Sequence, residues 1–149
     1  MAFDDKQLAG LLQGTRDFAG EMLEDAGKIM PFGGQVRPDG EIEFFAVVPA
    51  EDEITREAAY SQVEAALVER AGKGEIVAAV IVLDMVVPEA VETPLRDAIG
   101  ILIETPDFCR FFHATFKLTP AFLAGAKASV EFGEIIPMEA EPAIFANAA

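Results

Sequence analysis

The chain has 149 residues, of which 26 are acidic and 11 are basic, so its formal net charge is −15. One cysteine and one histidine exclude an intrachain disulfide framework and a structural zinc site with the usual four ligands. Because 52% of the residues are hydrophobic, the composition also excludes an intrinsically disordered chain, and the length predicts one domain spanning residues 1–149.

The first predicted element is a helix between Asp4 and Ile29, with Asp4 as its N-cap. The apolar side chains that recur at helical spacing are Leu8, Leu11, Leu12, Phe18, Ala19, Met22, Leu23 and Ala26. Three glycines weaken the pattern, because glycine disfavours a helix interior. Two interpretations stay open: one continuous helix, or a break near Gly14 with Thr15 capping a second helix.

A β-hairpin is predicted next, with arms at Phe32–Arg37 and Glu41–Val48. Pro38-Asp39-Gly40 between the arms favours a tight turn, because proline presets φ and glycine tolerates positive φ. In the second arm, Phe44 and Phe45 are expected on opposite faces of the sheet.

A second helix from Thr55 to about Ala71 and a strand from Ile76 to Val87 follow. The helix presents one apolar stripe, and Gly72 and Gly74 are expected to end it. Both faces of the strand are apolar except at Asp84. We therefore expect this strand to be central and covered on both sides by helix, loop or a partner subunit.

Pro106-Asp107 separates two further predicted strands, which are Asp97–Thr105 and Phe108–Leu118. If this pair is a two-residue turn, Glu104 lies opposite Cys109. Gly100 then lies opposite His113. A shift of one residue would move each of these partners to the other face of the sheet.

Together the elements predict an α+β fold. We expect a mainly antiparallel five-stranded sheet, in the order α-β-β-α-β-β-β, with the helices packed on one face. A helical turn over Pro120–Ala126 and a short edge strand over Ser129–Ile136 are expected near the end of the chain. The order is similar to that of profilin-like and roadblock-type domains, which commonly serve as dimerising scaffolds, and this likeness concerns topology alone.

Pro31-Phe32-Gly33, followed by Asp39-Gly40, resembles the hairpin entry and turn of a family of small, functionally uncharacterised bacterial proteins. Ala98-Ile99 and Glu104 also look like the Ala-Ile…Glu strand of that family. The resemblance covers about Pro31 to Glu104 and implies a helix and a central apolar strand after the hairpin. It implies no catalytic residues, since the family has none assigned. Turn chemistry also explains the glycines and the proline of this motif.

Four polar residues in or beside apolar strands are candidate ligand-binding residues: Glu104, Arg110, His113 and Asp84. Glu104 could act as a general base, although a polar strand end explains it as well. Arg110 could hold a carboxylate or phosphate, but its stem could equally cover apolar surface. His113 lies among phenylalanines, where a partly buried and satisfied histidine is the commoner outcome. Asp84 favours a structural ion pair, with Arg96 or Arg110, or a backbone donor.

The cysteine, Cys109, shares a strand face with His113, but four residues of strand span about 13 Å. That distance excludes a hydrogen-bonded thiolate–imidazole pair. The sequence also contains no phosphate-binding Gly-Lys-Ser/Thr loop, no Gly-x-Ser-x-Gly elbow and no His-Glu-x-x-His motif. We therefore expect no catalytic residues, no metal and no cofactor.

Charge and hydropathy predict the partners. The excess of acidic residues disfavours nucleic acids and anionic membranes. The longest apolar run, Ile76–Leu83, is far shorter than the roughly 20 residues of a spanning helix, and the N-terminus lacks a basic region, so we expect a cytoplasmic protein. The mean hydropathy is +0.30 despite the charge. This indicates more apolar strand surface than one copy can bury and favours a homodimer.

Three hypotheses for the function follow. The first is a non-enzymatic, dimeric binding or protein-interaction module. The second is a small-molecule-binding protein or enzyme with a phenylalanine-lined pocket for a small apolar ligand, in which Glu104, Arg110 and His113 supply the polar contacts. The third is an acidic inhibitor of a basic partner, similar to an immunity protein, which requires a dense acidic patch on one surface.

Overall fold

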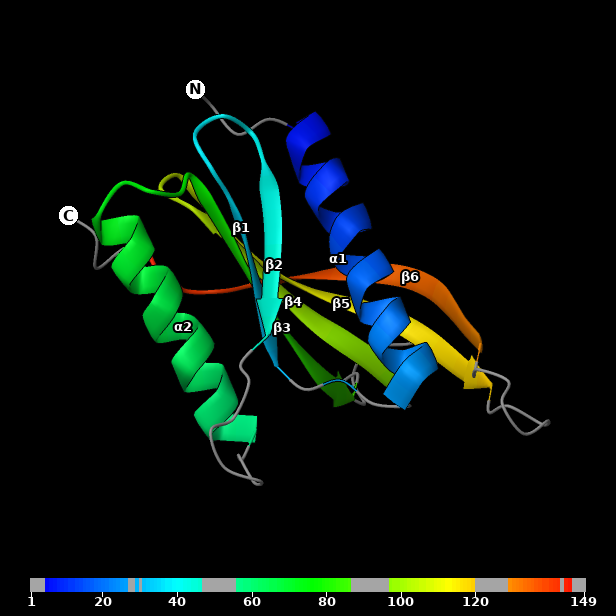
Figure 1. The fold of residues 1–149 in the computed structure, drawn as a ribbon. Coiled ribbons are helices and arrows are strands. Elements are labelled where there is room, and N and C mark those ends of the chain that lie inside the picture. The colour runs from blue at the N-terminus through cyan, green and yellow to red at the C-terminus, as the bar shows by residue number, and fades with distance from the viewer. Residues whose placement is uncertain are drawn as a thin grey trace.

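A computed structural model describes residues 5–26, 29, 31–46, 56–86, 97–119, 129–142 and 144–145. The elements in these residues are α1 (Asp5–Ala26), β1 (Phe32–Val36), β2 (Ile42–Ala46), α2 (Arg56–Gly72), β3 (Ala78–Val86), β4 (Asp97–Thr105), β5 (Phe108–Thr119) and β6 (Ser129–Glu139) (Figure 1). All the strands form one antiparallel sheet in the spatial order β2-β1-β3-β4-β5-β6. The predicted α+β class and the antiparallel sheet are confirmed.

The strand count of the prediction is wrong. The described residues form six strands where the predicted order contained five. The strand that makes the difference is β6, which runs to Glu139 and pairs along β5. The prediction had only a short edge strand over Ser129–Ile136 at this place. A register shift between Ala114 and Phe116 interrupts this pairing, and such irregularities bend a strand.

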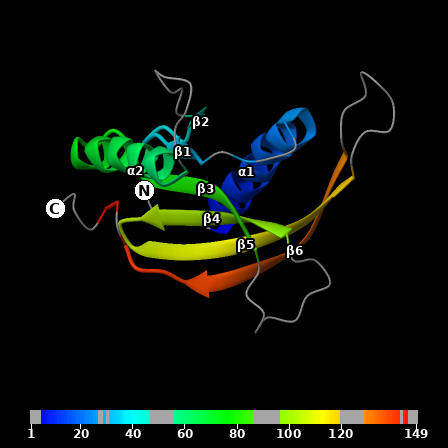
Figure 2. The same ribbon diagram turned by 90° about the horizontal axis from the view of Figure 1, so that it is seen from below.

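The expected placement of both helices on one face is also wrong. Val80 and Val82 of β3 pack in one core cluster with α1, whereas Ala79 and Ile81 pack in a second cluster with α2. Successive strand residues point to opposite faces, so the two helices cover opposite faces of the sheet. Figure 1 looks towards β2 with α2 and α1 on either side of it, and Figure 2 shows the row of strands β3 to β6. The physical reason is that β3 is apolar on both faces and each face needs a cover.

The first helix is continuous, which decides between the two interpretations of the glycine-rich segment. The Thr15 hydroxyl donates to the Leu11 carbonyl oxygen 2.7 Å away, inside the helix, so Thr15 does not cap a second one. A Cβ at Gly14 would lie 3.4 Å from the ring of Phe44 in β2. Gly20, which also lies on α1, faces the ring of Phe132 in β6 in the same way. The small residues therefore let aromatic side chains from both edge strands approach the helix.

The hairpin of β1 and β2 forms as predicted. The N–H of Gly40 donates to the carbonyl oxygen of Arg37 at 2.8 Å, and Gly40 has a φ of 90°. Phe32 is fully buried, with its ring centroid 4.7 Å from that of Phe18 in α1. Phe44 packs against the α1 cluster and Phe45 against the α2 cluster, as the alternation predicted.

The predicted register of β4 and β5 is confirmed. Glu104 lies opposite Cys109 and Gly100 opposite His113, with Pro106-Asp107 as the two-residue turn. The cap at Asp4 and the helical turn over Pro120–Ala126 lie outside the described residues, as does Arg96.

A search of the described helices finds none that is long and apolar enough to cross a membrane.

Candidate functional site

The structure separates the four residues predicted as ligand contacts. Strand alternation places Glu104 and His113 on the sheet face covered by α2, and Arg110 and Asp84 on the face covered by α1. Glu104 faces Cys109, which lies four residues along β5 from His113, so about 13 Å separates these positions. The four side chains therefore do not converge on one cavity.

Glu104 ties the C-terminal part of the chain to the sheet. Its side chain is fully buried, and its two carboxylate oxygens accept the N–H of Ile144 at 3.0 and 2.9 Å. One oxygen also accepts the N–H of Phe145. Ile144 is itself fully buried and packs in the α2 cluster. The geometry therefore gives Glu104 a structural role and leaves its carboxylate engaged rather than poised as a general base.

Cys109 lies beside Glu104 but is not prepared to act as a nucleophile. Its Sγ is 4.0 Å from Oε1 of Glu104. Burial, and after it the negative charge of Glu104, raise the pKa of the Cys109 thiol. A thiol with a raised pKa is mostly protonated near neutral pH, and the thiolate is the reactive form. The structure thus favours a structural role for this cysteine as a small, partly buried side chain.

His113 is buried without a hydrogen bond. It is 3% exposed, its ring meets the Phe111 ring edge-on at a centroid distance of 5.1 Å, and neither ring nitrogen has a partner among the described residues. Burial lowers the pKa of His113. The prediction of a buried histidine is confirmed, but the prediction of a satisfied one is wrong. Gly100 lies directly across on β4, where the absence of a side chain gives the imidazole room.

We predict that His113→Leu raises the free energy of unfolding by about 1–2 kcal/mol at pH 7, because it removes two buried polar atoms that have no partner. The unfolded histidine takes up a proton near its ordinary pKa of about 6.5, before the folded one does. The stability of the wild-type protein should therefore fall as the pH drops below that value, by at most about 1.4 kcal/mol per pH unit from this group. Urea denaturation of the wild-type protein and of His113→Leu, from about pH 5 to about pH 8, measures both free energies of unfolding. A difference between them that does not grow towards low pH would contradict the prediction.

The other two candidates lie near opposite ends of the α1 face. Arg110 is exposed and faces Glu139 across the β5–β6 pair. Asp84 is half-buried near the end of β3 and lies opposite Ile99. Asp84 belongs to the described lining of a cavity.

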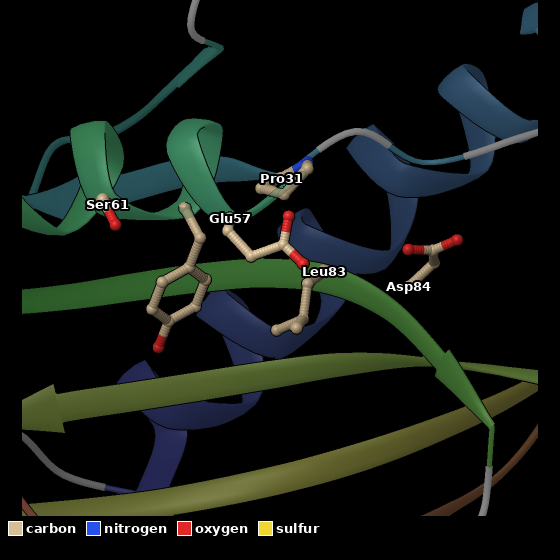
Figure 3. A pocket seen from close by; sticks show the side chains of 6 residues that line it. Pro31, Glu57, Ser61, Leu83 and Asp84 are labelled. Atoms are coloured by element: carbon tan, nitrogen blue, oxygen red, sulfur yellow. The ribbon is translucent and has the colours of Figure 1, made fainter. Parts of the chain in front are cut away.

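That cavity is an open cleft of about 430 Å³ between the first half of α2 and the end of β3 (Figure 3). The described residues that line it are Pro31, Glu57, Tyr60, Ser61, Leu83 and Asp84. The pairing of β1 with β3 ends at Phe32 and Val82, so β3 continues beyond its neighbour. Leu83 and Asp84 therefore lie beyond the end of the β1 pairing, and the cleft lies between this part of β3 and the first half of α2.

The cleft combines apolar surface with a few polar groups. Leu83 and Tyr60 are half-buried, and the Ser61 hydroxyl is on the exposed side of α2. Burial, followed by the charge of Glu64, raises the pKa of the Tyr60 phenol, so the phenol remains neutral and can donate or accept a hydrogen bond. This mixture of apolar wall and few polar contacts is typical of ligand pockets.

Tyr60 is the only tyrosine and the chain has no tryptophan, so its titration can be followed without interference. We predict that the absorbance change of phenol ionisation has its midpoint above the ordinary value of about 10. The same titration in urea, where the chain is unfolded, is the control and should give the ordinary value. A native midpoint at or below that of the unfolded chain would contradict the buried position of the phenol.

Most of this cleft was not predicted from the sequence, although one pattern pointed to Tyr60. Tyr60 precedes Val63 by three residues and Leu67 by seven, which places it on the buried stripe of α2. The depth of the cleft depends on how far β3 extends past β1, and that length difference has no signature in hydrophobic periodicity. The expected phenylalanine lining is not found, since the described lining residues include no phenylalanine.

A second hollow, of about 260 Å³, lies between the β1–β2 hairpin and the end of α2. The Arg70 guanidinium lies 4.6 Å from the centroid of the Phe45 ring and donates to Gln35 at 2.8 Å. Arg37 and Glu43 form an ion pair, and this contact raises the pKa of Arg37 and lowers that of Glu43. These polar groups satisfy one another, so the hollow is better explained as a surface network than as a ligand site.

Comparison with protein-family models, curated proteins and solved structures finds no match for this chain. The resemblance of the hairpin to a small bacterial family therefore stays an expectation, and the function has to be argued from geometry.

Two further observations bear on the alternatives. Within the described ranges, no three His, Cys, Asp or Glu side chains gather where they could hold a metal ion. Acidic residues lie on both helices, for example Glu21 on α1 and Glu64 and Glu69 on α2, which cover opposite faces. This spread does not support the single dense patch that an inhibitor of a basic partner requires.

Proposed function

We propose that the protein is a non-enzymatic binding module that holds the apolar part of a small ligand in the cleft between α2 and β3. The observation that carries this proposal is the cleft itself, whose volume of about 430 Å³ falls in the usual range of ligand pockets. The described lining residues include the Ser61 hydroxyl group but no histidine that could activate it as a nucleophile. Glu104 and Cys109, whose Oε1 and Sγ lie 4.0 Å apart, are not among those lining residues and are held in structural contacts.

A titration with octanol, monitored by the fluorescence of Tyr60, tests the proposal. Tyr60 lines the cleft and is the only source of intrinsic tyrosine or tryptophan emission, so a saturable change reports binding there. Leu83→Ala should weaken octanol binding about fivefold through lost apolar contact. Ile42→Ala is the control, because Ile42 is 39% exposed on the edge strand β2 and should leave the affinity unchanged. No saturable change, or equal affinities for all three proteins, would overturn the proposal.

The homodimer stays a prediction. Ile42 is the one large hydrophobic side chain that stands exposed among the described residues, and the two helices cover opposite faces of the sheet. These residues therefore do not support the argument from surplus apolar surface. Size-exclusion chromatography with light scattering decides the matter: a mass of 16.0 kDa at micromolar concentration identifies a monomer, and twice that mass a dimer.

A further inference from the structure

The charges beside the cleft indicate what kind of head group its ligand carries. Its described lining contains two acidic residues, Glu57 and Asp84, and no lysine, arginine or histidine. Glu57 is exposed on α2, at the cleft itself, whereas Asp84 is half-buried on β3 with its side chain on the α1 face, so Glu57 is the acid that can meet a head group in the cleft. Figure 3 shows the Glu57 carboxyl group near Leu83 and the Asp84 carboxyl group directed away from both. An apolar group that rests on Leu83 would therefore place its polar end near negative charge.

An aromatic ring in the same lining favours the same head group. Tyr60 contributes the only aromatic side chain among the described lining residues. The face of an aromatic ring attracts a cation, most strongly where both are partly removed from water. The net charge of −15 adds a long-range attraction for cations and a repulsion for anions. Local contacts and the overall field therefore act in the same direction.

We propose that the cleft selects a cationic amphiphile, that is, an apolar chain carrying one ammonium group. The chain occupies the apolar wall at Leu83 and Pro31, and the ammonium group lies beside the carboxyl group of Glu57 and the ring of Tyr60. This inference rests on the proposed function, because it names the chemical class of the ligand that the same cleft holds. A carboxylate on the same chain would meet repulsion from Glu57, and an alcohol would gain nothing from that charge.

Three probes with the same chain and different head groups test the selectivity: octyltrimethylammonium, octanol and octanoate. In low-salt buffer, titrations monitored by Tyr60 fluorescence should give the tightest binding for the cation and the weakest for the anion, with about tenfold between these two. At an ionic strength of 1 M, where the Debye length is about 3 Å, the difference should shrink while the affinity for octanol does not fall. Octanoate that binds as tightly as the cation in low salt would overturn the inference.

Two variants that remove the same charge at different places separate the local effect from the overall field. Glu57→Gln should weaken octyltrimethylammonium binding about threefold and change octanol binding by less than that. Glu21→Gln is the matched control, since Glu21 is exposed on α1, on the other side of the sheet. Equal losses of cation affinity in the two variants would overturn the inference, because they would assign the selectivity to net charge alone.

The outcomes for the neutral probe keep the two proposals apart. If octanol binds and Leu83→Ala weakens it, but the cation has no advantage, the selectivity is wrong and the binding function stands. If neither octanol nor the cation changes the Tyr60 emission in a saturable way, the proposed function fails and the inference fails with it.

Discussion

Glu104→Ala is expected to lower the free energy of unfolding by about 3 kcal/mol, the largest loss that we predict for a polar residue of this protein. The substitution removes the carboxylate that accepts the buried N–H of Ile144 and the N–H of Phe145. It also opens a cavity beneath Ile144, which is fully buried. Urea denaturation, followed by far-UV circular dichroism, measures the loss.

Two control variants make this result specific to the buried contact. Glu104→Gln keeps the shape and one carbonyl acceptor, so it should lose less than the alanine variant. Glu57→Ala removes an exposed carboxyl group and should change the unfolding free energy little. Hydrogen exchange adds a local readout, because the amides of residues 144 and 145 should exchange faster in Glu104→Ala. A loss no larger than that of Glu57→Ala would contradict the assignment of Glu104 as the anchor of this segment.

Gly34→Ala is expected to destabilise the protein by about 3 kcal/mol through overpacking. A Cβ at this position would lie 2.6 Å from Cγ1 of Val80 and 2.7 Å from the ring of Phe44. Val80 is fully buried in the central strand and Phe44 packs against α1, so neither can withdraw without disturbing the core. Thermal and urea denaturation measure the change.

Gly10→Ala is the matched control for this substitution. Gly10 lies in α1, and a Cβ there would have nothing within 4 Å. Alanine should therefore stabilise the helix, by up to about 1 kcal/mol. Opposite signs for the two glycines would confirm that close approach, and not backbone freedom in general, requires glycine at position 34. Equal shifts in the same direction would contradict the packing at β1.

Local patterns made much of the fold predictable from the sequence. Alternation placed Phe44 and Phe45 on opposite faces, and Pro38-Asp39-Gly40 fixed the turn before them. The two residues Pro106-Asp107 set the register of β4 and β5, so the pairing of Glu104 with Cys109 followed from counting. These features depend on neighbours in the chain, and sequence periodicity reports such neighbours directly.

Features that depend on distant partners could not be predicted in this way. The apolar faces of β3 require two covers, but nothing in its sequence says that α1 takes one face and α2 the other. The partner of Glu104 is Ile144, 40 residues further along the chain. Of the lining residues of the cleft, Asp84 alone was predicted as a ligand contact, because the cleft arises where β3 extends past the end of its pairing with β1.

The most direct test of the account is to locate the bound amphiphile by NMR. With octyltrimethylammonium added to isotope-labelled protein, the largest chemical-shift changes should map to the amides and side chains of Glu57, Tyr60, Ser61 and Leu83, the described residues at the α2–β3 cleft. Intermolecular nuclear Overhauser effects should connect the octyl chain to the Leu83 methyl groups and the ammonium methyl groups to the Tyr60 ring. Chemical-shift changes confined to α1 or to β6, with no change at the cleft residues, would contradict binding in the cleft.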